Sequence, residues 1–151
     1  MSCYICENNA NLGHLPARES ILVEGGWRIG HAFDSSLAGW LVLVPLRHVL
    51  ALHELGVSES RTLGDLLRRT TQALRQVTGC EKTYAMLFAE AEGFAHLHFH
   101  VVPRMPAFDT TVVGPNIFAL LNRPVGERLS EQEQDEIARR VGSALEKQVG
   151  L

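Results

Sequence analysis

Three histidines alternate with apolar residues in the middle of the chain. His96, His98 and His100 are separated by Leu97 and Phe99. Because successive side chains of a β-strand point to opposite faces, this spacing predicts three imidazoles on one face, with neighbours roughly 7 Å apart. The apolar residues between them would pack into the core on the other face. A single strand histidine carries little information, but three on one face with an apolar face behind them indicate chemistry.

Two kinds of chemistry use such a row. In the first, one imidazole attacks a phosphorus atom and forms a phosphoramidate while its neighbours hold phosphate oxygens. In the second, several imidazoles bind a metal ion that activates water. Geometry disfavours the second reading, because the third histidine, four residues along a flat strand, lies far from a metal held by the first two.

The N-terminus carries a second group of candidate ligands. Cys3 and Cys6 have the spacing that lets both thiolates reach one Zn²⁺ ion. A tetrahedral structural site needs two more ligands, and the available histidines outside the row are His14, His31, His48 and His53. Of these, His48 has the most suggestive setting, since it follows an apolar segment that ends in Pro45. The pair by itself leaves metal binding, redox chemistry and an inert role open.

Composition restricts the partners. The chain has 151 residues, 46% of them hydrophobic and 21% charged, with a net charge of −3. No basic run suggests a polymeric nucleic acid partner, whereas a small nucleotide needs only a few local donors. The N-terminus does not resemble a targeting segment, and the longest apolar stretch, Leu41 to Leu46, is too short to span a bilayer. Three cysteines form no disulfide framework. We therefore expect a single cytoplasmic domain over residues 1–151 that contacts no membrane.

Periodicity and turn signals predict the elements that position these residues. The expected elements are strands at Ser20–Glu24, Arg28–Phe33 and Trp40–Leu46, a helix from Ser58 to Gly79, strands at Thr83–Ala89 and His96–Val102, a short helix within Gly114–Asn122, and a last helix from Ser130. Gly25-Gly26 is a hairpin signal, and Ser130 with Glu133 fits a capping box. This order predicts an α+β fold with a mostly antiparallel sheet of about five strands and two main helices.

With these features in view, the chain resembles the histidine triad family. The resemblance rests on the row itself, followed by two apolar residues and Pro103-Arg104. It also rests on the segment from Gly39 to Val49, Gly-Trp-Leu-Val-Leu-Val-Pro-Leu-Arg-His-Val, which is similar to the family's Gly-His-x-Leu-Val-x-Pro-Lys-x-His stretch. It spans about Cys3 to Arg104.

The resemblance implies a fold, an activity and an assembly. The fold would be an antiparallel sheet with two helices, and the protein would form a homodimer. His98 would attack the α-phosphate of a nucleotide and form a nucleotidyl-histidine intermediate, which water or another acceptor would resolve. His100 would hydrogen-bond the phosphate or the bridging atom. The backbone carbonyl of His96 would orient the His98 ring, which leaves the attacking nitrogen with a free lone pair.

The resemblance also implies a structural zinc site. Zinc-bearing members of the family and the related hexose-phosphate uridylyltransferases use a Cys-x-x-Cys pair, a histidine at the His48 position and the first triad histidine. Carried over, the ligands would be Cys3, Cys6, His48 and His96. Such a Cys2His2 set is closed, and it leaves His98 free for chemistry.

The chain departs from the family pattern near the expected phosphate site. Many members have Gly-Gln-Ser-Val before the triad, where the serine and backbone amides contact phosphate. Here the segment Glu90-Ala91-Glu92-Gly93-Phe94-Ala95 stands instead, so only the backbone around Gly93 is carried over. Trp40 replaces the usual histidine after Gly39. Asp34 is the candidate for contacting the ribose, and Arg104 is a candidate phosphate donor.

Three functions therefore remain to be separated. The favoured one is a nucleotide phosphoesterase or nucleotidyl transferase that acts on a nucleoside phosphoramidate or a dinucleoside polyphosphate through His98. A zinc-dependent metallohydrolase that uses the whole row is the second. A non-catalytic nucleotide-binding module is the third, and the missing serine motivates it.

Overall fold

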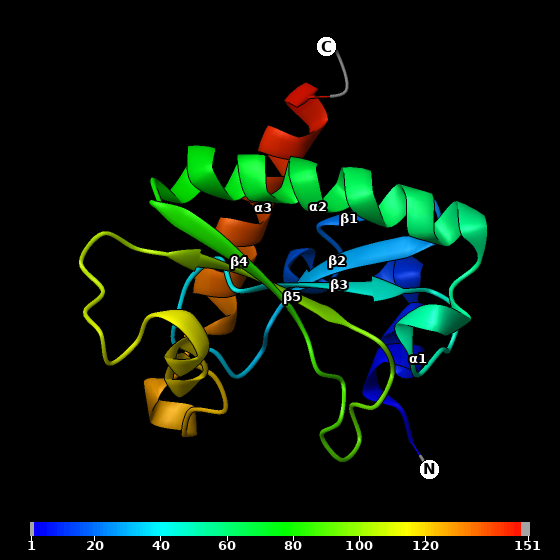
Figure 1. Cartoon of the computed structure of the whole chain (residues 1–151), viewed down its shortest axis with the longest axis horizontal. Helices are drawn as coiled ribbons and strands as arrows, with labels where there is room; N and C mark the ends of the chain where they lie inside the picture. Colours follow the sequence, from blue (N-terminus) through cyan, green and yellow to red (C-terminus); the bar gives the residue numbers. More distant parts are fainter. Residues whose placement is uncertain (1, 149–151) are drawn as a thin grey trace.

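A five-stranded antiparallel sheet forms the centre of the computed structural model, which describes residues 2–148. The strands are β1 (Leu22–Glu24), β2 (Trp27–His31), β3 (Leu41–Pro45), β4 (Lys82–Leu87) and β5 (Phe99–Arg104), in the order β1-β2-β3-β5-β4. Every neighbouring pair is antiparallel. The apolar strand β3 lies in the middle, as its composition predicts. The expected α+β fold with five antiparallel strands is confirmed (Figure 1).

The hairpin between β1 and β2 depends on its two glycines. Gly25 and Gly26 have φ values of +57° and +84°, a region that favours glycine. A Cβ atom at Gly25 would also lie 2.6 Å from the Thr62 side chain, so helix and turn approach closely here. The predicted hairpin signal is confirmed.

Two long helices cover one face of the sheet. They are α2 (Val57–Thr78), which runs across the strands, and α3 (Glu131–Gln148), which crosses behind it (Figure 1). Gly79 ends α2 with a φ of +71°. Ser130 and Glu133 form the predicted capping box, with bonds of 3.1 and 2.7 Å. The core between helices and sheet contains Trp27, Ile29, Leu41, Leu43, Leu66, Leu74, Leu97, Val101, Val141 and Leu145.

The histidine strand is shifted relative to its prediction. It begins at Phe99 rather than at His96, and it continues to Arg104 instead of ending at Val102. Before the strand, the chain bends at His96, whose side chain belongs to a cluster with the N-terminus. Pro103 is tolerated because β5 pairs with β3 only as far as Val101, and beyond that point only β4 borders it.

The opposite face of the sheet carries shorter elements that the sequence predicted only in part. The 3₁₀ helix η4 (Gly114–Leu120) lies where a short helix was expected, and its Ile117 packs on Trp40 and Val102. The six-residue helix α1 (Tyr4–Asn9) was not predicted, because one and a half turns show no measurable periodicity. Further 3₁₀ turns are η1 (Leu12–His14), η2 (Ala17–Glu19), η3 (Leu52–Glu54) and η5 (Val125–Glu127). Of these segments, α1, η2 and η4 border a cavity over the strands.

Among the described helices, none combines the length and apolar character needed to cross a bilayer. The ends of the predicted domain, residues 1 and 149–151, lie outside the described residues.

His31 makes the stability of the fold depend on pH. It is 2% exposed, accepts a hydrogen bond from the Gly39 N–H at 3.0 Å and donates to the Ala32 carbonyl at 2.8 Å. Burial lowers its pKa from 6.5 to about 4, an effect that the Ala32 carbonyl partly offsets. Because the folded protein resists protonation of this ring, its stabilising contribution is complete above pH 6.5 and is lost progressively as pH falls to about 4.

We expect the free energy of unfolding of His31→Gln to fall by roughly 3 kcal/mol less than that of the native protein between pH 7.5 and 4. Urea unfolding between pH 7.5 and 4 measures this slope. His53→Gln, which changes an exposed histidine, is the control and should leave the slope as in the native protein. Equal slopes for the native and His31→Gln proteins would show that this ring is protonated as easily in the folded as in the unfolded state.

Candidate functional site

A cavity of about 430 Å³ lies on the sheet face that the long helices do not cover. Its floor comes from alternate residues of three strands, and its walls come from α1, from the loop after β4 and from the η4 region. Its lining includes Tyr4, Glu19, Arg28, Phe33, Asp34, Val44, Phe88, Glu90, Phe94, His98 and His100. The alternation predicted for the histidine row therefore brings His98 and His100 into one cavity, with Leu97 and Val101 in the core behind them.

His98 is held in one tautomer by its own chain. Its Nδ1 lies 2.8 Å from the backbone oxygen of His96. A carbonyl oxygen can only accept, so Nδ1 carries the proton and Nε2 keeps its lone pair. The ring is half-buried and lines the cavity. This arrangement matches what a nucleophilic imidazole needs.

His100 is also fixed in one tautomer, and its partner is Trp40. The indole Nε1–H, which can only donate, lies 3.0 Å from Nδ1 of His100. The proton of the neutral imidazole is therefore on Nε2. Burial, and to a smaller degree the neighbouring His98, lowers the pKa of His100 to about 4, so the ring is neutral at pH 7. The His98 and His100 rings meet edge to face with centroids 4.9 Å apart, which is closer than the spacing expected for a flat strand.

The side chains of the four predicted metal ligands lie close together beside the bend before β5. One donor atom from each of Cys3, Cys6, His48 and His96 lies within 4.8 Å of all the others. Cys6 Sγ is 3.2 Å from His48 Nδ1 and 3.4 Å from His96 Nδ1, and the two imidazole nitrogens are 3.1 Å apart. Cys3 Sγ is 3.6 Å from His96 Nδ1. A tetrahedral zinc ion with ordinary bond lengths would set its sulfur–nitrogen and nitrogen–nitrogen edges at about 3.3–3.6 Å.

Surrounding groups orient these donors. The other nitrogen of His96, Nε2, lies 2.9 Å from the Pro45 carbonyl oxygen, so Nε2 carries the proton and Nδ1 is left to face the cluster. The Cys6 backbone N–H donates to Cys3 Sγ at 3.4 Å, which holds this sulfur in place. A soft, closed Cys2His2 set with a fixed histidine tautomer is the donor chemistry of a structural zinc site.

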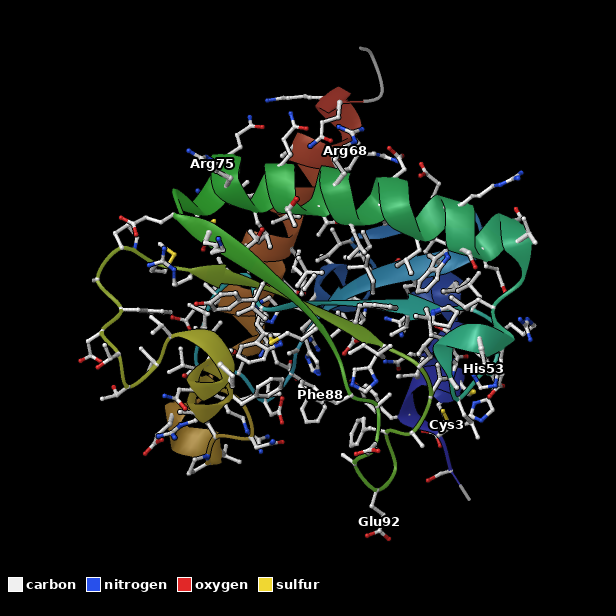
Figure 2. All side chains as sticks on the ribbon, in the orientation of Figure 1. Cys3, His53, Arg68, Arg75, Phe88 and Glu92 are labelled. Atoms are coloured by element: carbon white, nitrogen blue, oxygen red, sulfur yellow. The ribbon has the colours of Figure 1, made fainter. Side chains whose placement is uncertain are left out.

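The remaining predicted site residues have separate positions. Asp34 lines the cavity. Arg104 does not: its guanidinium pairs with Glu81 at 3.1 Å, at the far end of β5. Gly93 is not part of the cavity lining, although Glu90 from the same loop is. Glu92 points away from the sheet at the tip of that loop (Figure 2). The structure therefore brings Asp34 together with His98 and His100 but leaves Arg104 and Gly93 outside.

Two features of the cavity were not expected from the sequence. The rings of Tyr4, Phe33 and Phe94 form a group with centroids 5.3–6.0 Å apart. The buried pair of Arg28 and Glu19 lies beside it. Of these residues, Arg28 could have been noticed in the sequence, since it is a charged residue between the apolar residues Trp27 and Ile29 of a strand.

Comparison with known proteins places the fold. No model of a protein family matches the chain, and no curated protein does. Solved structures do match. A zinc-bound histidine triad family protein from Mycobacterium smegmatis is 19% identical, with 99% of this chain and 97% of that chain covered and a TM-score of 0.71. A histidine triad protein from Sinorhizobium meliloti is 23% identical, with 83% and 87% covered and a TM-score of 0.68.

The Plasmodium falciparum diadenosine triphosphate hydrolase is a more distant match, 14% identical, with 88% of this chain and 80% of that chain covered and a TM-score of 0.63. At these identities the likeness shows the fold and not the reaction. The chain thus has the α+β fold that these proteins share, and it carries a Cys2His2 cluster beside the cavity.

Proposed function

We propose that this chain, which has the histidine triad fold, is a nucleotide hydrolase or nucleotidyl transferase. It cleaves at the α-phosphate of a nucleotide substrate and uses His98 as the nucleophile. The observation that carries this proposal is the 2.8 Å contact between His98 Nδ1 and the His96 carbonyl, inside a cavity of nucleotide size. This contact leaves His98 Nε2 unprotonated and available to a ligand in the cavity.

The reaction has two displacements at phosphorus. In the first, the lone pair of His98 Nε2 forms a bond to the α-phosphorus, and the bond to the leaving group breaks with its electron pair. The leaving group takes up a proton from solvent, and the positive charge on the nucleotidyl-imidazole is stabilised by the His96 carbonyl. In the second, water attacks the phosphorus and loses a proton to solvent, and the phosphorus–nitrogen bond breaks with its electron pair returning to His98 Nε2. If another acceptor replaces water, the product is a transferred nucleotide.

His100 acts on the same phosphate as a neutral donor. With Nδ1 engaged by Trp40, its Nε2–H is available to a phosphoryl oxygen or to the departing atom. A neutral donor adds no charge that would repel an imidazolium at His98. Trp40 is therefore a positioning residue, and it stands where the family usually has histidine.

We expect Trp40→Phe to lower kcat by about 10-fold with little change in KM, because His100 loses its tautomer lock while the ring volume is nearly kept. Trp27→Phe is the matched control: its indole N–H bonds the Glu59 carbonyl on the helix side, so it should cost stability but not kcat. Steady-state kinetics of both variants decide this. Equal kcat losses in the two variants would reduce Trp40 to a packing role.

Zinc is the metal that the Cys3, Cys6, His48 and His96 set fits, and we propose that it is resident there. When bound, it supplies a structural cross-link between α1 and the bend before β5. These residues hold the His96 backbone, and so its carbonyl, in place against His98. The cluster thus fixes the orientation of the His98 ring through the His96 carbonyl and takes no part in the bond changes at phosphorus.

The cavity charges favour one of the two substrate classes. Apart from Tyr4 and the three histidines, its ionisable lining consists of Glu19, Asp34 and Glu90 with a single arginine, Arg28, which already pairs with Glu19. A dinucleoside polyphosphate would bring several negative charges to this acidic lining without a counter-ion. A nucleoside phosphoramidate carries one, and its amine leaving group suits the nearby Glu90. We therefore propose phosphoramidates as the preferred class.

The alternatives differ in what they need from the same residues. A metallohydrolase built on the whole row would need a free nitrogen with a lone pair from each of the three histidines. Both nitrogens of His96 are engaged, by the cysteine cluster and by the Pro45 carbonyl. Nδ1 of His100 accepts from Trp40, so its other nitrogen carries the proton, and only His98 keeps a free lone pair. A non-catalytic binding module would use the same cavity without turnover. The homodimer and the cytoplasmic location stay predictions.

The experiment is the release of nucleoside monophosphate from phosphoramidates and dinucleoside polyphosphates, each in an adenosine and a guanosine series. We expect turnover with a preference for phosphoramidates. Tight monophosphate binding without any turnover would instead support the binding module.

A further inference from the structure

Arg28 is a buried cation in the cavity that the proposed reaction does not use. The residue is only 1% exposed. The strand register pairs it with Val44 on β3, and Val42 pairs with His100 on β5. Arg28 and His98 therefore lie at the same level of the cavity floor with β3 between them. Two strand spacings separate them, about 10 Å, which is roughly the length of one nucleoside.

The guanidinium is held on one side and open on the other. Its Nε donates to Asn9 Oδ1 at 2.8 Å, and Nη1 donates to the Glu19 backbone oxygen at 2.5 Å, with Glu19 Oε2 at 3.4 Å. Gly30 lies beneath it, where a Cβ atom would be 3.2 Å from Nη1. By contrast, Nη2 has no hydrogen-bond partner within residues 2–148, and it is not among their fully buried unpaired atoms. It therefore reaches the cavity.

Glu19 already balances the charge of this arginine. Its carboxylate accepts from the Tyr4 hydroxyl at 2.6 Å and from Asn8 Nδ2 at 3.1 Å, in addition to Arg28. Apart from the histidines and Tyr4, the other ionisable groups that line the cavity, Asp34 and Glu90, are acidic. An anionic ligand group would gain little here, because the charge of Arg28 is already balanced by Glu19 and the nearby carboxylates would repel it. The open N–H groups of Nη2 instead suit an uncharged acceptor.

The wall beside Arg28 is aromatic. Tyr4, which bonds Glu19, lies 5.3 Å from Phe33 and 5.7 Å from Phe94 between ring centroids, and the last two rings stack at 27°. Flat apolar rings beside a planar donor form a surface that fits a nucleobase, since every base presents a π face.

We propose that Arg28 is a specificity-determining residue that recognises the ring carbonyl of a 6-oxopurine. With the α-phosphate at His98 and the base on the aromatic wall, Nη2 donates to O6 of guanine or hypoxanthine. Arginine is the usual partner of this carbonyl edge. Adenine presents an amino group at the same place, so N–H would face N–H. This inference rests on the proposed function, because it places the phosphate at His98.

The test is calorimetric binding of inosine, guanosine and adenosine 5′-monophosphates to the metal-containing native protein. At the purine, inosine and adenosine monophosphates differ in the oxo or amino group at C6 and in the N1 proton that accompanies the oxo form. We expect the dissociation constants of the two oxo nucleotides to be about 10-fold or more below that of the amino nucleotide. Equal or tighter binding of adenosine monophosphate would overturn the base assignment and leave the proposed reaction standing. A folded protein that binds none of the three would contradict both.

Variants then assign the preference to Arg28. Arg28→Met removes the donor, and Glu19→Gln is combined with it so that no unpaired carboxylate stays buried. We expect the double variant to bind inosine and adenosine monophosphates within about threefold of each other, whereas Glu19→Gln alone keeps the preference. Arg68→Met, at an exposed arginine that pairs with Asp65, is the control. If the double variant misfolds, the comparison of nucleotides on the native protein still decides the inference.

Discussion

His98→Ala is expected to lower kcat/KM for nucleotide cleavage by about 10⁴-fold or more, because it removes the atom that forms the bond to phosphorus. The loss should come without structural damage. The His98 ring is half-buried in the cavity, and its hydrogen bond goes to its own chain two residues away. Metal content and the unfolding temperature should therefore stay close to those of the native protein.

The control for this variant is His53→Ala, which removes an exposed imidazole in η3, outside the cavity lining. Its kcat/KM should equal the native value. If His98→Ala retained a tenth of the native turnover, His98 could not be the nucleophile, and the neighbouring His100 or a bound water would have to be reconsidered.

Removal of one cluster ligand is the second large effect. Cys6→Ser should lower the zinc content and reduce the unfolding temperature by about 10 °C, because a metal that binds only the folded chain contributes its binding free energy to folding. Cys6 lies within 3.4 Å of both His48 and His96, so its loss removes one of the four corners of the tetrahedron. Metal analysis and thermal unfolding, with and without a chelator, measure the effect.

Cys80→Ala provides the matched control, since Cys80 is a buried cysteine outside the cluster. It should keep the metal and should lose stability in the presence of the chelator to the same extent as the native protein, whereas Cys6→Ser should hardly respond to the chelator. A native protein that contained no zinc after preparation with zinc, and whose unfolding temperature ignored the chelator, would refute the structural metal site.

Much of the scaffold could be predicted because its signals are local. Side-chain alternation located the histidine row and its core face, glycine marked the first hairpin and the end of α2, and Ser130 with Glu133 marked the start of α3. The strand limits were less accurate around His96, where a tertiary contact with the N-terminal cysteines bends the chain. Local patterns carry no information about such contacts.

The site was predictable where residue types alone define the chemistry. The Cys2His2 set and the pair of His98 and His100 came from spacing and from resemblance, and the structure brings each group together. The Arg28–Glu19 pair and the aromatic wall could not be foreseen, because their residues come from α1, η2, β2, the segment after β2 and the loop before β5, which meet only after folding. Arg104 shows the converse: a charge adjacent to the motif in sequence faces Glu81 in space.

The central claim is that a nucleotide becomes bonded to His98, and intact-mass spectrometry of enzyme quenched during turnover tests it most directly. The account predicts a mass increase of one nucleoside monophosphate minus water, located by digestion on the peptide that contains His98 and absent from His98→Ala. Turnover by the native protein with no adduct at any quench time, or an adduct on a peptide without His98, would contradict it.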